Sequence, residues 1–168
     1  MSERFKMPVF TAVILKKGDE VCLLRRANAK LHDGFYAIAG GGVDGGESVI
    51  QATIREAQEE LGVNLDLKNL SMVHVLHVRT EIGNEYINFF MEVSAWSGEP
   101  SIMEPEKCND VSWFSLARLP EKIMPMHKHV FEMIAAGVLY SEYGWPVVDQ
   151  VAEKIMDRYA DVFKKLAK

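Results

Sequence analysis

The sequence predicts a layered domain of the α/β or α+β class, built around a mixed β-sheet. Runs of β-branched and aliphatic residues alternate with helical patterns along the chain, in the order strands, helix, strands, helix. The length of 168 residues suits one domain with a terminal extension and leaves little room for a second domain. Hydrophobic residues make up 48% of the chain and charged residues 26%, which is typical of a globular protein.

The first half of the chain predicts two strands and a helix. Val9–Leu15 and Val21–Leu24 are rich in β-branched and aliphatic residues, and a polar, glycine-containing turn separates them. Gly40–Gly46 follows, with five glycines in seven positions. A helix is then predicted from about Ser48 to Leu61, because the glycine that comes next is the residue type that most often ends helices.

The second half predicts a further strand pair, a short strand and a helix. Met72–Arg79 and Tyr86–Trp96 have strand composition and are joined by a turn that contains Gly83. Val111–Phe114 predicts a short strand, and Met126–Tyr140 predicts a second helix.

The C-terminal segment is predicted to be separate from this arrangement, which divides the chain into a domain at 1–144 and an extension at 145–168. Trp145-Pro146 interrupts the pattern, and apolar residues then recur at spacings of three and four. These residues are Val147, Val151, Ile155, Tyr159, Val162 and Leu166. We expect an amphipathic helix that packs on its own domain or forms a homodimer contact.

Charge and cysteine content exclude several classes of protein. Lys and Arg number 19 and Asp and Glu number 24, so the formal net charge is −5. This argues against binding to duplex DNA or to an anionic membrane, but not against a small phosphate ligand held through a metal.

Cys22 and Cys108 provide neither a disulfide framework nor zinc-site spacing. Free thiols and a start without a signal-peptide pattern predict a cytoplasmic location. The longest apolar runs are much shorter than the roughly 20 residues of a membrane-spanning helix.

Three glutamates on the first predicted helix point to chemistry. At about 100° per residue, Glu56, Glu59 and Glu60 share one face. The apolar residues Ile50, Ile54, Ala57 and Leu61 form another stripe, so we expect this stripe to face the core and the acidic stripe to face away from it. Like charges within one turn repel each other, and a cation should offset them. Arg55 is one candidate, and a hard divalent ion such as Mg²⁺ is the other.

Fixed spacings around these glutamates favour a functional site over a solvated acidic face. Gly41 is followed by five residues and then Glu47, and seven more residues lead to Arg55-Glu56, with Gly62 closing the segment. Glycines permit close backbone approach, so the loop that precedes the helix can reach a metal or a phosphate.

The segment Gly41–Val63 resembles the complete signature of the Nudix (MutT-like) hydrolases. The likeness implies a Nudix-type α/β/α sandwich with a mixed sheet over Pro8–Glu142. One departure is Ala39 before Gly40-Gly41, where many members have proline, which affects loop rigidity and not the ligands. Further runs resemble small Nudix proteins that include nucleotide pyrophosphatases. They are 25–28, 33–35, 96–100, 104–108, 113–114 and 119–120.

The resemblance implies a role for each matching residue. It implies Mg²⁺, with Mn²⁺ as a substitute, held by Glu56, Glu59 and Glu60 with the carbonyl of Gly40. Glu47 and Arg55 are expected to orient these carboxylates. The general base is expected to be Glu59, with Glu104 and Glu106 as alternatives. The candidate substrate-binding residues are Arg25, Arg26, Gly41, Glu104 and Glu106.

Histidines and aromatic residues are given lesser roles. No histidine has a suitable ligand pair, so surface or capping positions are expected for His74, His77, His127 and His129. Five aromatic residues are candidates either for stacking on a base or for core packing. These are Phe35, Tyr36, Phe89, Trp113 and Phe114.

The predicted activity is Mg²⁺-dependent hydrolysis of a nucleoside diphosphate linked to another group. A (d)NTP converted to (d)NMP and pyrophosphate is the first candidate. ADP-ribose or another nucleotide-sugar or dinucleotide is the second. A non-catalytic nucleotide-binding regulator is the third, and is disfavoured because every signature glutamate is present. The expected partner is a small nucleotide, with no nucleic-acid polymer and no membrane. A homodimer is one of the two alternatives for the C-terminal segment.

Overall fold

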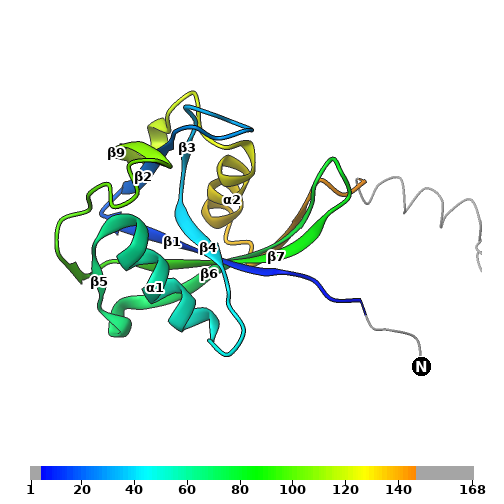
Figure 1. Cartoon of the computed structure of the whole chain (residues 1–168), viewed down its shortest axis with the longest axis horizontal. Helices are drawn as coiled ribbons and strands as arrows, with labels where there is room; N and C mark the ends of the chain where they lie inside the picture. Colours follow the sequence, from blue (N-terminus) through cyan, green and yellow to red (C-terminus); the bar gives the residue numbers. More distant parts are fainter. Residues whose placement is uncertain (1–4, 147–168) are drawn as a thin grey trace, which may run out of the picture.

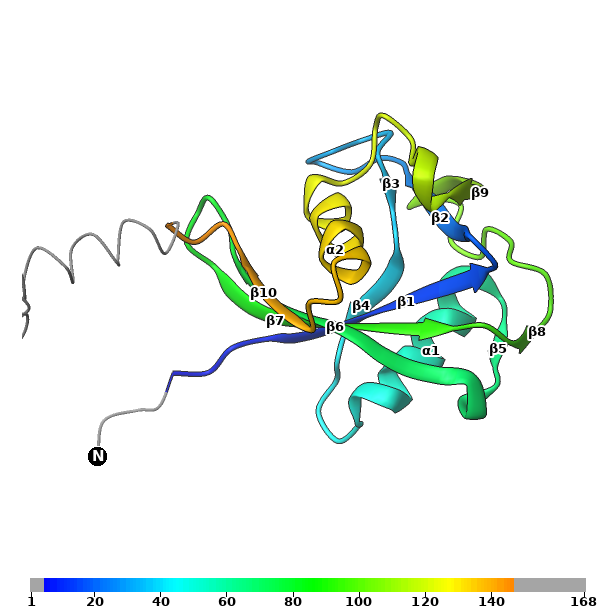
Figure 2. The same cartoon turned by 180° about the vertical axis from the view of Figure 1, so that it is seen from behind.

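The structure is a computed structural model that describes residues 5–146, and it consists of a mixed β-sheet between two helices (Figures 1 and 2). The helix α1 (Val49–Leu61) packs against one side of the sheet and α2 (Pro125–Ala135) lies on the other. The predicted mixed-sheet α/β sandwich is therefore confirmed.

The strand β1 (Val9–Lys17) occupies the centre of the sheet. It runs parallel to β7 (Glu85–Val93) and antiparallel to β2 (Glu20–Arg26) and β4 (Ala39–Gly42). The remaining strands extend the sheet outward on both sides. On the β7 side, β6 (Leu70–Arg79) pairs with β7, and β10 (Tyr140–Tyr143) pairs with β6. On the other side, β3 (Tyr36–Ala37) and β9 (Cys108–Ser115) both pair with β2. Two short strands, β5 (Asn64–Leu65) and β8 (Trp96–Ser97), pair separately. Single 3₁₀ turns lie at Leu67–Asn69 and Leu116–Arg118.

Alternation along β1 supplies both hydrophobic cores. Ala12 and Ile14 belong to the core beneath α2, whereas Val13 and Leu15 belong to the core beneath α1. Successive side chains of a strand point to opposite faces, so a buried central strand is apolar on both sides. This explains why Val9–Leu15 reads as a continuous hydrophobic run.

The helix predicted over Met126–Tyr140 is wrong beyond Ala135. Helix α2 ends at Ala135, and Gly137 adopts a left-handed conformation with φ 71°. The backbone N–H of Val75 donates to the carbonyl of Leu139 at 2.8 Å, and the chain then pairs with β6 as β10. Pairing with a distant strand therefore overrides the helical pattern of this segment.

Other predicted ends of elements lie closer to the observed ones. The strand predicted to end at Trp96 ends at Val93, and Trp96 instead belongs to β8. The helical extension predicted for 145–168 lies outside the described residues beyond Pro146. Among residues 5–146, no helix has the length and apolar character needed to cross a membrane.

Candidate active site

Helix α1 has well-defined ends, which fix the rotation of its side chains. The Ser48 hydroxyl accepts a hydrogen bond from the N–H of Gln51 at 3.3 Å, and the Gln51 side chain accepts one from the N–H of Ser48 at 2.7 Å. This reciprocal pair is a capping box. At the other end Gly62 has φ 70°, as the sequence predicts for a helix-terminating glycine.

The buried face of α1 differs from the predicted one. Ala52, Ala57 and Leu61 are buried as apolar residues, but Glu56 is only 8% exposed and Ile50 is 48% exposed. The expectation that the acidic stripe faces away from the core is thus wrong for Glu56. The cause lies in β4, whose glycines have no side chains and leave space for a carboxylate beside the sheet.

Two consecutive glycines of β4 make this close approach possible. A Cβ atom at Gly41 would overlap the carboxylate of Glu56, and one at Gly40 would overlap the backbone of Thr11. Gly40 also has φ 153°, which side-chain-bearing residues rarely adopt. Its N–H donates to Glu60 Oε2 at 2.8 Å. The glycine loop therefore holds both glutamates directly against the sheet.

Arg55 connects the remaining acidic residues. Its Nη1 donates to Glu56 Oε1 at 2.7 Å and to Glu59 Oε2 at 3.0 Å. Its Nη2 donates to Glu47 Oε1 and to the carbonyl of Gly42, both at 2.8 Å. These bonds hold the pKa of Glu47 below its usual value. The guanidinium thus fixes three carboxylates and one carbonyl in a single network.

Negative charge near Glu60 is less well compensated. Burial raises the pKa of Glu60 to about 7, the N–H of Gly40 opposes this rise, and the charges of Glu56 and Glu104 add to it. Burial likewise raises the pKa of Glu56, although the hydrogen bond from Arg55 acts in the opposite direction. Crowded carboxylates with raised pKa values are the environment that a hard divalent cation stabilises.

The donor set fits such an ion chemically. Carboxylate oxygens on one helix, beside the partly buried backbone of the strand β4, are the ligands that Mg²⁺ prefers. Within residues 5–146 there is no ready-made group of three or more acidic, histidine or cysteine ligands. Arg55 holds the Glu56 and Glu59 carboxylates, so a cation would compete with its guanidinium for those oxygens.

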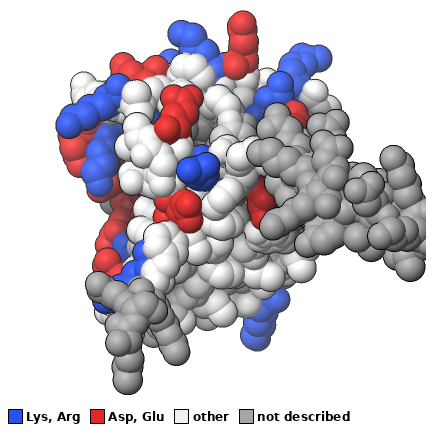
Figure 3. All heavy atoms as spheres, turned by 90° about the vertical axis from the view of Figure 1, so that its right-hand side faces the viewer, with Lys and Arg blue, Asp and Glu red and all other residues white. Residues whose placement is uncertain are grey.

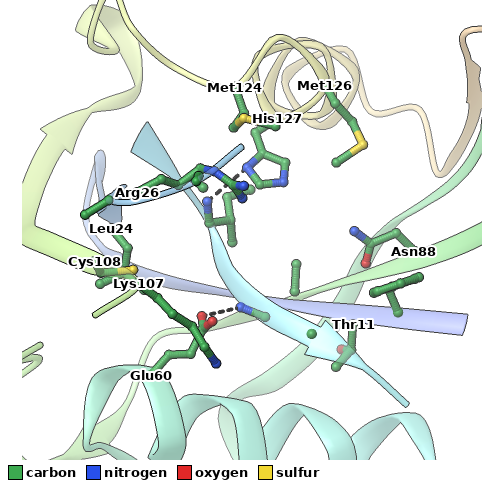
Figure 4. Close-up of a pocket in the computed structure, with 18 of the residues that line it drawn as sticks. Thr11, Leu24, Arg26, Glu60, Asn88, Lys107, Cys108, Met124, Met126 and His127 are labelled. Atoms are coloured by element: carbon green, nitrogen blue, oxygen red, sulfur yellow. Dashed lines mark hydrogen bonds between the residues drawn. The ribbon is translucent and has the colours of Figure 1, made fainter. Parts of the chain in front are cut away.

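A cavity of about 530 Å³ opens beside Glu60 (Figure 4). Its walls come from β1, β2, β4, β7, the loop before β9 and the start of α2. The predicted site residues that line it are Arg26, Gly40, Gly41, Glu60 and Glu106. The volume lies within the range of ligand pockets in proteins.

Several predicted residues lie elsewhere. Arg25 does not line this cavity, and its Nε donates to Asn109 Oδ1 at 2.7 Å. Glu104 accepts a hydrogen bond from Lys107 Nζ at 2.6 Å, and Lys107 in turn lines the cavity. None of the five aromatic candidates lines it, and its aromatic side chains are those of Phe10 and Tyr86.

The prediction of a surface or capping position is wrong for two histidines. His74 is fully buried, and its Nδ1 bonds to the carbonyl of Val138 at 2.9 Å. His127 is 7% exposed and lines the cavity, and its Nδ1 accepts a hydrogen bond from the N–H of Ile38 at 3.0 Å. Burial lowers the pKa of His127 to about 4.

Sequence reasoning also missed Asn88, a buried residue of β7 that lines the cavity. Signals for both missed residues existed. His127 precedes Val130 and Phe131 by three and four positions, which places it on the apolar face of α2. Asn88 lies between Tyr86 and Phe90 in a strand, so the three side chains share one face.

Comparison with known proteins places this geometry in a family. The model of the NUDIX domain matches residues 6–135. The NAD-capped RNA hydrolase NudC of Pseudomonas aeruginosa is 34% identical over 114 residues, which are 64% of this chain and 36% of that protein. The chain thus spans about a third of the length of that curated relative. A putative 8-oxo-dGTP diphosphatase of Bacillus subtilis is 28% identical over 116 residues, 69% of this chain and 71% of that protein.

Solved structures agree with the family match. A MutT NUDIX hydrolase from Burkholderia pseudomallei is 26% identical with a TM-score of 0.70, covering 76% of this chain and 98% of that chain. A MutT protein from Bacillus halodurans, at 22% identity, shares the fold with a TM-score of 0.67, covering 83% of this chain and 92% of that chain. The domain match, the signature residues and the fold agree, and the chain belongs to the Nudix (MutT-like) hydrolase family.

Proposed function

We propose that this chain is a divalent-metal-dependent hydrolase that cleaves the pyrophosphate linkage of a nucleoside diphosphate derivative. The observation that carries the proposal is the position of Glu60, which belongs to the acidic cluster of α1 and also lines the cavity. A substrate with its phosphates at Glu60 has space for its remaining groups in the same cavity.

The signature residues have distinct tasks in this proposal. Glu56, Glu59 and Glu60, with the carbonyl of Gly40, would hold Mg²⁺ or Mn²⁺. A bound divalent ion neutralises phosphate charge and lowers the pKa of a bound water. Arg55 and Glu47 orient the carboxylates through the bonds described above.

Glu59 is proposed as the general base because its side chain is 52% exposed and can reach solvent water. Glu104, whose carboxylate is bonded to Lys107, and Glu106 are the alternatives. Arg26, Gly41 and Glu106 line the cavity and are proposed to contact the substrate. Arg25 lies outside the cavity lining, and its predicted contact with the substrate stays a prediction.

A nucleoside triphosphate is the first substrate class. Its support is the likeness to a putative 8-oxo-dGTP diphosphatase, which extends over most of both proteins. The products would be a nucleoside monophosphate and pyrophosphate.

A dinucleotide of the NAD type is the second class, favoured by the likeness to NAD-capped RNA hydrolases. Those relatives are named as acting on an RNA, so the absence of a nucleic-acid partner stays a prediction for this chain. The face shown in Figure 3 carries acidic and basic side chains interspersed over its coloured part.

A hydrolysis panel with product analysis tests the proposal. It contains canonical and oxidised (d)NTPs, ADP-ribose, NADH and dinucleoside polyphosphates, with Mg²⁺ or with a chelator, and Glu59→Gln as the control enzyme. Pyrophosphate released from a triphosphate supports the first class. Turnover of conjugates alone supports the second. A folded, metal-loaded protein that turns over none of them contradicts the proposed function, and nucleotide binding without turnover would favour a regulator.

A further inference from the structure

A second cavity, of about 660 Å³, lies on the α2 side of the sheet and shares no lining residue with the cavity beside Glu60. The strands β1, β2 and β7 and the helix α2 contribute to both cavities, but with different residues. On β1, residues 10–12 line the cavity beside Glu60, whereas Ile14 and Lys16 line the second cavity. The two cavities are therefore separate spaces, and the second takes no part in the proposed function.

The base of the second cavity is apolar. Ile14, Val21 and Phe131 line it, and all three belong to the core beneath α2. Leu119 and Ile134 pack against the same core and extend the wall. Side chains of this kind offer no hydrogen bonds to water, so the space favours an apolar ligand group over solvent.

Small side chains keep this space open to solvent. Ala135 ends α2, Ala117 lies in the 3₁₀ turn Leu116–Arg118, and both are exposed residues that line the second cavity. Leu116, next to Ala117, also lines it and is 36% exposed. The volume lies within the range of ligand pockets in proteins. A small molecule can therefore enter the second cavity from the surface.

The charged residues around the second cavity carry more positive than negative charge. Lys16 Nζ forms an ion pair with Glu92 Oε2 at 3.2 Å, which compensates both charges. Among residues 5–146, neither Arg118 nor Lys128 takes part in an ion pair. Glu132 follows Lys128 by four positions on α2 and offsets its charge in part. The Arg118 guanidinium is thus an uncompensated cation beside an apolar space.

We propose that the second cavity binds a small amphipathic anion, in which an apolar body carries one terminal carboxylate. The apolar body occupies the space between β1 and α2, where its burial removes hydrocarbon surface from water. The carboxylate lies at the opening and accepts two parallel hydrogen bonds from the guanidinium of Arg118. The inference goes beyond the proposed function and does not depend on it.

Charge complementarity favours this class of ligand over the alternatives. A cationic ligand would lie close to Arg118 and Lys128, where like charges repel. A neutral hydrocarbon would fill the base and leave the guanidinium without a partner. A nucleotide would bring polar ring and sugar groups against Ile14, Val21 and Phe131, which have no hydrogen bonds to offer them.

Three variants test the two halves of the site. Arg118→Glu reverses the charge at the opening, and Arg118→Lys keeps the charge but removes the planar fork. Ala135→Leu places a larger side chain in the apolar space. The matched controls are Lys122→Glu and Ala136→Leu, which make equivalent changes at exposed residues that line neither cavity. Ala117→Leu replaces Ala135→Leu if circular dichroism shows that the latter does not fold.

Calorimetric titration of the metal-free protein with octanoate, octan-1-ol and octylammonium measures binding. We expect octanoate to bind with a Kd below about 1 mM, at least about fivefold tighter than the neutral and cationic probes. Arg118→Glu and Ala135→Leu should each weaken octanoate binding at least about fivefold, Arg118→Lys should weaken it less, and the controls should match the wild type. No binding of octanoate up to about 10 mM, or equal binding by folded Arg118→Glu and Ala135→Leu, would overturn the inference.

Methyl NMR shows which cavity the octanoate occupies. Ile14 and Ile134 line the second cavity, whereas Ile38 lines the cavity beside Glu60. Bound octanoate should shift the methyl signals of Ile14 and Ile134 and leave that of Ile38 unchanged. Shifts confined to Ile38 would place the ligand in the other cavity and overturn the inference. Neither experiment involves hydrolysis, so failure of this inference is distinguishable from failure of the proposed function.

Discussion

The N–H of Gly40 donates to Glu60 Oε2 at 2.8 Å and joins the last turn of α1 to the strand β4. Of the three glutamates proposed as metal ligands, Glu60 alone lines the cavity described above. This one bond therefore links the glycine loop, the acidic helix and the substrate space. Its geometry depends on two glycines with different neighbours. Gly40 lies against the backbone of β1, and Gly41 lies against the Glu56 carboxylate.

Alanine substitutions at Gly40 and Gly41 should have different consequences. At Gly40 a methyl group would meet the immobile backbone of β1, so Gly40→Ala should lower the free energy of unfolding by about 2–4 kcal/mol. At Gly41 the three nearest atoms belong to the carboxylate end of the Glu56 side chain, which can shift where backbone cannot, so Gly41→Ala should stay folded and lose Mg²⁺ affinity and turnover. Urea denaturation and metal titration measure the two effects.

Gly42→Ala is the matched control for this pair. Its nearest neighbour is an aromatic carbon of Phe10 at 4.0 Å, which is ordinary contact. We expect near wild-type stability and metal affinity. Equal losses of stability and metal affinity in all three variants would mean that the loop is sensitive to any side chain. The contacts assigned to Gly40 and Gly41 would then be incorrect.

Glu60→Gln should abolish most activity while stabilising the metal-free protein at high pH. The folded-state pKa of Glu60 is raised to about 7 from an ordinary value of 4.5, so its contribution to stability declines as pH rises from 4.5 through 7. Glutamine does not titrate, and at pH 8 the variant should exceed the wild type by about 1–3 kcal/mol. Denaturation with a chelator at pH 4.5 and pH 8 measures this difference, which should be small at the lower pH.

Glu59→Gln provides the comparison, because Glu59 is 52% exposed. Both variants should reduce turnover by at least about 100-fold, but Glu59→Gln should change stability little at either pH. If Glu59→Gln raised the free energy of unfolding at pH 8 as much as Glu60→Gln does, burial would not be the cause of the stabilisation.

Arg55→Lys should separate charge from geometry in the acidic network. A lysine keeps one positive charge but cannot contact Glu47, Glu56, Glu59 and the Gly42 carbonyl from one planar group. We expect turnover to fall about 10- to 100-fold and stability to fall by about 1 kcal/mol. Arg79→Lys is the control, since its nearest contact with Glu85 is 3.9 Å and its side chain is 43% exposed. Full activity in Arg55→Lys would show that charge alone suffices.

Acidification should destabilise the protein partly through His127. Burial, with a smaller effect of the Arg26 charge, lowers its folded-state pKa from 6.5 to about 4. The unfolded chain binds the proton more readily, so this contribution is fully present above pH 6.5 and is lost as pH falls toward 4, by roughly 3 kcal/mol. The buried His74, whose pKa is also lowered by burial, acts in the same direction.

Glu60 opposes this trend over part of the range, so the contribution of His127 is best measured by difference. The free energy of unfolding of the wild type minus that of His127→Asn should fall as pH is lowered from 7 to 4 in the presence of a chelator. A pH-independent difference would show that His127 is not held neutral by burial.

Much of the candidate site was predictable because its signal is local. The capping box at Ser48, the terminating Gly62 and the spacing of Glu56, Glu59 and Glu60 depend on neighbours within a few positions. Arg55 likewise reaches Glu59, four positions later, and Glu47, eight positions earlier. Helix geometry relates such residues without knowledge of the rest of the fold.

Residues that meet across the fold were not predictable in the same way. Asn88 and His127 enter one cavity from β7 and α2, and the N–H that fixes the His127 tautomer belongs to Ile38, 89 positions away. The burial of Glu56 on α1 depends on Gly41 of the strand β4, and the end of α2 depends on β10 pairing with β6.

The sequence by itself determined the fold class, the family and the acidic helix, because periodicity, capping and fixed motif spacing are properties of contiguous chain. Only the tertiary structure decided which side of α1 is buried, where the cavity lies, and which polar groups face it. Those features arise from packing between segments far apart in the chain, and packing also sets the burial that raises the pKa of Glu60 and lowers that of His127.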